Sequence, residues 1–136
     1  MIDIGTMNLL KHARETPAGL HLSDEEGNEV LLPASQHKEQ FKKGAQLEVF
    51  IYTDGDGKPL ASLQKPYAEL NTFFYLRATA ITEIGAFLDW GLEKDLLVPF
   101  SEKPEDMEEG TFYVVYIYLD DISKRIVASS KIERFI

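Results

Sequence analysis

The sequence has no cysteine, only three histidines and no long hydrophobic run. Without cysteine the chain cannot form a disulfide, hold an iron–sulfur cluster or use a thiol in catalysis, and this composition fits a reducing compartment. No run of about 18 apolar residues is present to span a bilayer, and the N-terminal segment lacks the basic end and continuous apolar stretch of a secretory signal. We therefore expect a cytoplasmic protein with no membrane contact.

Positive charge is also scarce. The chain has 14 Lys and Arg against 23 Asp and Glu, which gives a net charge of −9. Counted along the sequence, residues 1–66 carry 7 basic and 10 acidic groups, and residues 67–136 carry 7 and 13. Such a surface repels a polyphosphate unless its cations gather on one face, so we expect weak non-specific affinity for nucleic acid.

Motifs of catalysis and metal binding are missing as well. The sequence has no nucleophile elbow, phosphate-binding loop or glycine-rich dinucleotide motif. Residues 54–57 (DGDG) begin like a calcium loop, but Lys58 and Lys65 occupy positions that need oxygen ligands, so this segment predicts a hairpin turn. The histidines lack the spacing of a metal site, and we expect His12 and His37 at the surface or partly buried. We expect neither an enzyme nor a bound cofactor.

An internal repeat organises the chain. When the sequence is aligned with itself at an offset of 66 residues, 11 of the 36 positions from residue 19 to residue 54 are identical, whereas chance gives about two or three. The identical pairs include Gly19 with Gly85, Pro33 with Pro99 and Tyr52 with Tyr118. We infer two duplicated domains, at residues 1–66 and 67–136.

Each half of the sequence shows short strands separated by turn-forming residues. In the first half the expected strands cover residues 8–13, 19–23, 29–33, 47–52 and 60–63, with a helical turn within residues 36–43. In the second half they cover residues 74–81, 85–90, 95–99, 112–119 and 125–129. Five strands with a short helical connection between the third and the fourth predict an all-β chain of two tandem five-stranded Greek-key barrels of the OB type.

The second half resembles a known RNA-binding domain in three segments. These are residues 77–80 (RATA), residues 84–91 (IGAFLDWG) and residues 97–102 (LVPFSE). They are similar to the S1-type domain of the large small-subunit ribosomal protein, which has a phenylalanine-glycine-alanine-phenylalanine turn into its second strand and a later leucine-valine-histidine segment. The resemblance implies tandem S1-like OB domains, the first of them divergent.

Two longer segments resemble a more specific family. Residues 84–99 (IGAFLDWGLEKDLLVP) and residues 126–135 (IVASSKIERF) are similar to the bacterial conserved virulence factor B family. Its members have several S1-like domains and a winged-helix domain. The resemblance implies that this chain is part of a larger multi-domain protein.

Phe87 is the residue through which the resemblance implies RNA binding. A strand alternates its faces, so Phe87 points outward if Ala86, Leu88 and Trp90 point into the barrel. From that position it can stack on a base, a contact worth about 1 to 3 kcal/mol that any base can make. The alternative is that Phe87 packs against the neighbouring domain or a partner protein.

The resemblance also implies contacts to phosphate. Arg77 would supply one cation, and Lys124 or Arg125, in the turn between the fourth and fifth strands, would supply another. In the first half Lys11 corresponds to Arg77, and His21 takes the place of the stacking phenylalanine. We therefore expect the first domain to be the weaker RNA platform.

Two other segments have structural interpretations. Strand alternation places Tyr113 in the core and Tyr116 and Tyr118 on the barrel exterior. The acidic run in residues 102–109 is expected to be a solvated connection, and its functional alternative is docking to a basic partner.

The sequence therefore predicts a non-enzymatic regulator that binds single-stranded RNA. It departs from the family pattern where Ile84 replaces the first aromatic residue and where Pro33 and Pro99 replace the histidine. These replacements favour the alternative, a protein-interaction or scaffolding module whose barrels have lost RNA binding and whose acidic surface docks a partner.

Overall fold

The computed structural model describes residues 1–37, 40–103 and 107–136. The chain forms two compact units, Met1–Lys65 and Pro66–Ile136, which we call unit 1 and unit 2. Within the described ranges, no helix has the length and apolar character needed to cross a bilayer.

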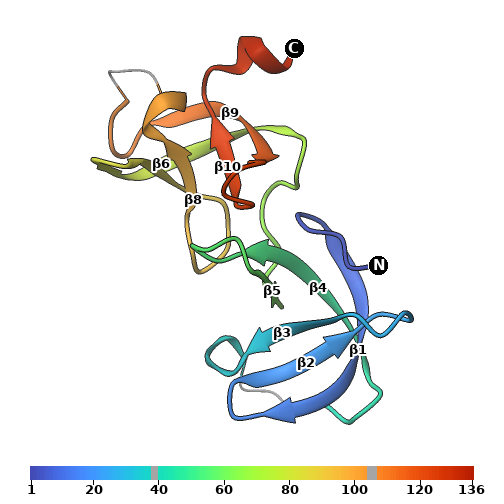
Figure 1. Ribbon diagram of the computed structural model, residues 1–136. Coiled ribbons are helices and arrows are strands. Elements are labelled where there is room, and N and C mark those ends of the chain that lie inside the picture. The colour runs from blue at the N-terminus through green and yellow to red at the C-terminus, as the bar shows by residue number, and fades with distance from the viewer. Residues whose placement is uncertain (38–39, 104–106) are drawn as a thin grey trace. The chain divides into compact units, whose positions relative to one another are not determined.

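Unit 1 is a closed five-stranded barrel (Figure 1). Its elements are β1 (Met7–Thr16), β2 (Gly19–Ser23), β3 (Glu29–Pro33), the short 3-10 helix η1 (Ala34–Gln36), β4 (Gln46–Thr53) and β5 (Pro59–Ser62). The strands follow the order β1-β2-β3-β5-β4 around the barrel. A parallel pair, Leu31 with Leu60, closes the seam between β3 and β5.

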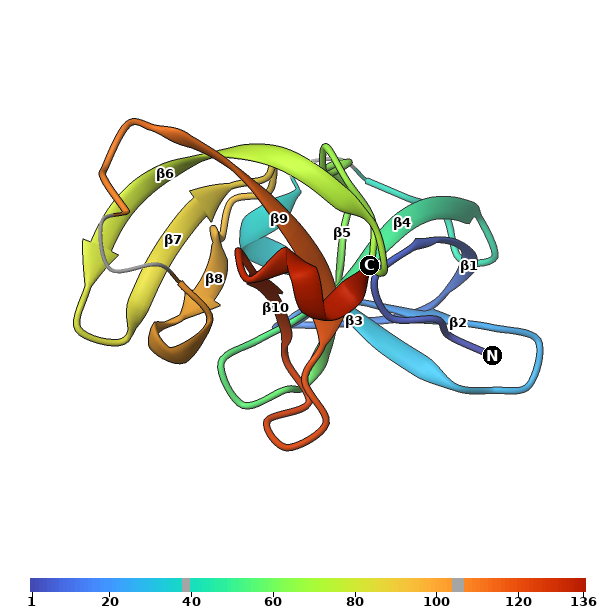
Figure 2. The ribbon, with the colours of Figure 1, turned by 90° about the horizontal axis from the view of Figure 1, so that it is seen from above.

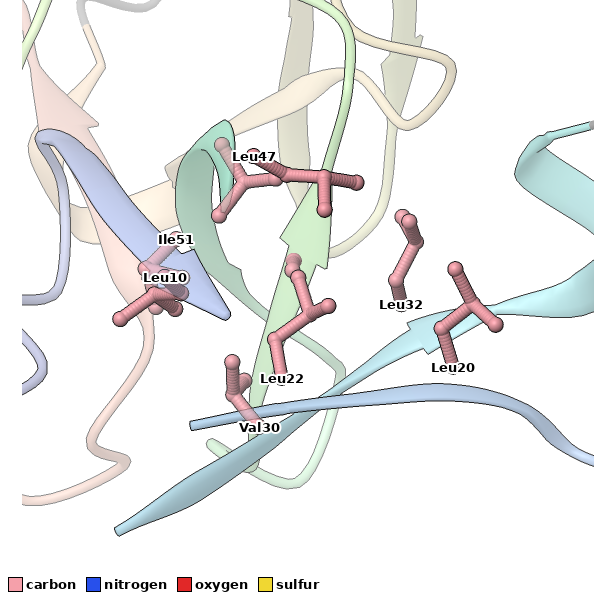
Figure 3. Packing of buried hydrophobic residues seen from close by; sticks show 9 residues of the cluster. Leu10, Leu20, Leu22, Val30, Leu32, Leu47 and Ile51 are labelled. Carbon is pink, nitrogen blue, oxygen red and sulfur yellow. The ribbon is translucent and has the colours of Figure 1, made fainter. Parts of the chain in front are cut away.

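Strand alternation builds the core of unit 1. Every second residue of β2, β3 and β4 is apolar and buried, because one face of each strand points into the barrel. Figure 3 shows these side chains gathered in the interior: Leu10, Leu20, Leu22, Val30, Leu32, Leu47 and Ile51. Burial of one such side chain contributes about 1.5 to 3 kcal/mol, so this cluster is the main support of the barrel.

Unit 2 repeats the same order of elements and adds one. They are β6 (Phe73–Thr82), β7 (Gly85–Asp89), β8 (Leu96–Pro99), η2 (Phe100–Glu102), β9 (Phe112–Leu119), β10 (Ile126–Ser129) and the added helix η3 (Ile132–Phe135). Its sheet has the order β10-β9-β6-β7-β8, and Figure 2 shows β6, β7 and β8 side by side. Among the described residues β8 and β10 form no hydrogen-bonded ladder, so the seam that is closed in unit 1 is open in unit 2.

One glycine in each unit allows two strands to approach closely. Gly19 begins β2 and Gly85 begins β7, with φ angles of 145° and 146°. A Cβ atom at Gly19 would collide with the carbonyl oxygen of Leu32, and one at Gly85 with that of Val98. Only glycine therefore fits these positions, which explains why the repeat has glycine at both.

The structure confirms the all-β fold with two tandem five-stranded, barrel-like OB-type sheets, and it corrects two local expectations. β1 continues to Thr16 instead of ending at residue 13, because a β-bulge after His12 lets the strand bend and keep pairing with β2. The short helix lies at residues 34–36, and the described part of residues 37–43 is not helical. Residues 38–39 lie outside the described ranges.

Two side chains expected in contact with solvent are buried. His12 follows the inward-pointing Leu10 by two residues, so it points into the barrel and is 6% exposed. Glu102, at the start of the acidic run, is 9% exposed. Residues 104–106 of that run lie outside the described ranges.

Candidate nucleic-acid interface

Phe87 lies on the outer face of β7. Its neighbours Ala86 and Leu88 are fully buried, whereas Phe87 itself is half-buried, as strand alternation predicts. Its cross-strand partner in β8 is Leu97. Trp90 is buried, as expected, and its indole Nε1 donates a hydrogen bond to the carbonyl oxygen of Lys94 at 2.9 Å.

A pocket of about 430 Å³ opens at the seam between β8 and β10. This volume is within the range of small-ligand sites, roughly 300 to 1,000 Å³. Its apolar and aromatic lining comes from Leu97 and Pro99 of β8, Tyr118 of β9 and Val127 of β10. Its charged lining comes from Glu102, Asp120, Arg125 and Arg134. Because Leu97 lines the pocket and pairs with Phe87, the pocket and the half-buried ring of Phe87 are neighbours on one face.

The two cations proposed in the turn between β9 and β10 differ in their position relative to the pocket. Arg125 lines the pocket, whereas Lys124 is exposed at the turn with a φ of 63° and is not among the lining residues. The carboxylate of Asp120 fixes the turn, because its Oδ2 accepts a hydrogen bond from the backbone N–H of Ser123 at 2.8 Å. Hydrogen bonding with Ser123 also lowers the pKa of Asp120, which keeps a negative charge beside Arg125.

Tyr118 supplies the aromatic part of the pocket. It lies opposite Val127 of β10 on the outer face of the sheet. Burial raises the pKa of its hydroxyl, and the nearby carboxylate of Glu102 raises it further. Tyr118 is therefore a neutral hydrogen-bond donor at physiological pH.

An ion pair lies at one side of the pocket. Nη2 of Arg134 is 2.8 Å from Oε1 of Glu102, and Nη1 donates a hydrogen bond to Oε2 at 3.0 Å. The pair compensates the charge of the buried Glu102. Its two members are far apart in sequence, so no local pattern reveals it.

Arg77 lies one strand away, on β6. It is exposed and pairs with Asp89 of β7 and with Phe112 of β9. Asp89 follows Phe87 by two residues on the same face, which makes Arg77 a diagonal neighbour of Phe87. We call the surface formed by Phe87, Leu97 and the lining of the seam pocket the seam face. It includes Phe87 and Arg125, with Arg77 at its margin, whereas Lys124 is not among the lining residues.

In unit 1 the counterparts of Phe87 and Arg77 are His21 and Lys11, and His21 has polar contacts. The ring Nε2 of His21 is 2.9 Å from Oγ1 of Thr16, and its Nδ1 is 3.9 Å from Oε1 of Glu29. Arg14 forms an ion pair with Glu29 at 2.9 Å, and this contact lowers the pKa of Glu29. Lys11 is exposed on β1.

Sequence reasoning missed a second cation in unit 1. The backbone N–H of Asp54 donates to the carbonyl oxygen of Lys58, and that of Asp120 donates to the carbonyl oxygen of Arg125, both at 2.9 Å. Lys58 is therefore the structural counterpart of Arg125. The turn in unit 2 is one residue longer, so an alignment without gaps does not match the two.

Three comparisons with known proteins bear on this geometry. The S1 domain family matches residues 4–64 and 72–131 of this chain. The uncharacterized protein YitL of Bacillus subtilis (strain 168) is 30% identical over 91 residues, which cover 66% of this chain and 30% of that protein. A crystal structure of a multidomain protein with nucleic acid binding domains from Streptococcus pneumoniae TIGR4 has a TM-score of 0.70 at 21% identity. It covers 92% of this chain and 45% of that chain, and this likeness concerns the fold.

Proposed function

This chain belongs to the S1 domain family, and from this premise we propose that it binds single-stranded RNA through the seam face of unit 2. The S1 domain is a nucleic-acid-binding, non-enzymatic fold, in agreement with the expectation that the chain is not an enzyme. One observation carries the proposal: an outward, half-buried ring, Phe87, lies beside a pocket lined by Arg125.

The proposed mechanism combines stacking with a small number of phosphate contacts. A base stacks on Phe87, and the apolar seam formed by Leu97 and Val127 accommodates its edge or the neighbouring sugar. Arg125 contacts the adjacent phosphate, and Arg77 contacts a second one from the margin. Two phosphate contacts predict a shallow salt dependence, with a slope of about −1.4 in log K against log salt for a single strand.

Unit 1 has a supporting role in this proposal. His21 occupies the position of Phe87, but its contacts with Thr16 and Glu29 restrict the ring. The cations that unit 1 itself offers to an RNA phosphate are Lys11 and Lys58. We therefore expect unit 1 to add phosphate contacts at Lys11 and Lys58 and little stacking.

The proposal also concerns the larger protein in which this chain works. The chain spans 30% of YitL and 45% of the multidomain protein, so it matches only part of each relative. We propose that it works within a larger cytoplasmic regulator of the conserved virulence factor B family, which the segments in residues 84–99 and 126–135 support. The alternative, a scaffolding module, is favoured by the net charge of −9 and by the loss of the family histidine at Pro99.

Fluorescence anisotropy with labelled oligo-U and oligo-A at about 50 and 200 mM salt tests the RNA proposal. We expect saturable binding that Phe87→Ala weakens by about 5- to 100-fold. Arg125→Gln should weaken binding and reduce the salt slope by about 0.7. Phe100→Ala is the control, because Phe100 is 64% exposed and lies outside the pocket lining. A folded chain that binds neither RNA at low salt would support the scaffolding alternative.

A further inference from the structure

A second surface of unit 2 carries exposed aromatic rings that the proposed RNA site does not use. On the outer face of β6, Phe73 and Tyr75 are 42% and 60% exposed, and on β9, Phe112 and Val114 are 47% and 44% exposed. The strand register pairs Phe73 with Tyr116 and Tyr75 with Val114. We call these five residues the aromatic ladder.

Contacts between its rings make the ladder an ordered surface. Tyr75 and Phe112 are stacked with centroids 5.2 Å apart and planes inclined by 25°. Phe73 contacts Tyr116 at 4.7 Å, and Tyr116 in turn stacks on Phe135 of η3 at 4.4 Å. Because each ring is supported by a neighbour, little conformational entropy is lost when a ligand covers the exposed faces.

The repeat shows that the fold does not require this ladder. In unit 1 the same register pairs Leu9 with Glu48, where unit 2 pairs Tyr75 with Val114. The position of Phe112 is occupied there by Gln46, which pairs with Lys11. The other two ladder positions are apolar in unit 1 as well, with Met7 opposite Phe50, but unit 1 has no counterpart of the stacked pair Tyr75–Phe112. A contiguous exposed apolar patch on a soluble domain commonly marks an interaction site.

Charge determines which partner this surface suits. Residues 67–136 carry 13 acidic and 7 basic groups. Glu108 and Glu109 are exposed just before Phe112, and Glu133 is exposed in η3. Two arginines lie near the ladder, and each faces a carboxylate: Arg77 lies opposite Asp89, and Arg134 pairs with Glu102. The exposed carboxylates beside the ladder therefore favour a cationic partner over a second copy with its own charge of −9.

We propose that the aromatic ladder binds an extended, arginine-bearing segment of a partner protein. A guanidinium stacks on exposed aromatic rings and forms bidentate contacts with carboxylates, and this surface offers both. Along β9 the outward positions at Phe112, Val114 and Tyr116 repeat about every 6.8 Å. An extended segment with arginine at alternate positions has the same period and can place successive guanidinium groups along the ladder.

The test uses a short labelled peptide in which arginine alternates with serine. Fluorescence anisotropy should show saturable binding that weakens with salt, whereas the matching glutamate–serine peptide should not bind. The double substitution Tyr75→Leu with Phe112→Gln installs the residues of unit 1 at exposed positions, so the fold should be retained. It should weaken binding about tenfold, the loss expected for two exposed cation–π contacts. Tyr67→Leu, which removes a 58% exposed ring outside the ladder, should have no effect.

Two results would overturn the proposal. They are no binding of the arginine peptide at low salt, and equal binding of the peptide by the double variant and the parent chain. The proposal is independent of RNA binding at the seam face. Phe87→Ala should leave peptide affinity unchanged, and Tyr75→Leu alone, whose cross-strand partner is Val114, should leave RNA affinity unchanged.

Discussion

The ring of Phe135 stacks on the ring of Tyr116, with centroids 4.4 Å apart and planes inclined by 20°. One residue earlier, Arg134 pairs with the buried Glu102. These two contacts hold η3 against β9, where Figure 2 shows it, and place Arg134 in the lining of the seam pocket. The helix is therefore an integral part of unit 2.

Replacement of Arg134 by alanine should destabilise unit 2. The substitution leaves the carboxylate of Glu102 buried without its cation, a change that costs several kcal/mol for fully buried pairs. Because Arg134 is 54% exposed, we expect a smaller loss of about 1 to 2 kcal/mol in the free energy of unfolding, measured by urea denaturation. The double variant with Glu102→Gln should recover part of the loss. Equal stability of Arg134→Ala and the parent chain would contradict the assigned role of this pair.

A leucine at position 12 should stabilise unit 1. His12 is 6% exposed, and within the described residues neither ring nitrogen has a hydrogen-bond partner. Leucine has a similar volume and needs no partner, so His12→Leu should raise the free energy of unfolding by about 1 kcal/mol. His21→Leu is the control: it removes the contact with Thr16 and should bring no gain. A loss of stability in His12→Leu would contradict this account, because it would mean that an ordered partner forms a hydrogen bond with a ring nitrogen of His12.

Gly85→Ala should unfold or strongly destabilise unit 2. The added Cβ would overlap the carbonyl oxygen of Val98, and the φ angle of 146° is unfavourable for alanine. We expect a loss of more than about 2 kcal/mol in thermal or urea unfolding. Gly55→Ala is the matched control, since a Cβ at Gly55 meets no atom within 4 Å. Similar effects of the two substitutions would contradict the close approach of β7 and β8.

The pKa of Glu29 should depend on Arg14. Hydrogen bonds from Arg14 lower this pKa from its ordinary value of 4.5. Because the pKa is lower in the folded chain than in the unfolded chain, the ionised carboxylate stabilises the fold above pH 4.5. This contribution is lost as the pH falls through the folded-state pKa. NMR titration of the Glu29 carboxyl should show the pKa returning toward 4.5 in Arg14→Gln, and an unchanged pKa would rule out this contact in solution.

Local sequence patterns predicted the fold well. The repeat and the strand periodicity identified all ten strands, and alternation placed Phe87 and Tyr118 on the outer face, because these properties depend on residues close together in the chain. The extension of β1 to Thr16 was missed because a bulge shifts the alternation there.

Contacts between distant residues were not predicted. The pair Glu102–Arg134 joins residues 32 positions apart, so the acidic run around Glu102 gave the misleading impression of a solvated segment. The stack of Tyr75 on Phe112 likewise becomes visible only when the register of β6 with β9 is known. The assignment of RNA contacts to Phe87, Arg77, Lys124, Arg125, His21 and Lys11 remains a prediction.

NMR mapping tests RNA binding at the seam face most directly. A ¹⁵N-labelled chain would be titrated with a short oligo-U at low salt, and the backbone amide shifts would be followed. RNA binding at the seam predicts the largest changes at Phe87, Leu97 and Arg125, with Tyr75 and Val114, which pair with each other on the ladder, unaffected. Changes confined to unit 1 or to the aromatic ladder, or no changes in the folded chain, would contradict it.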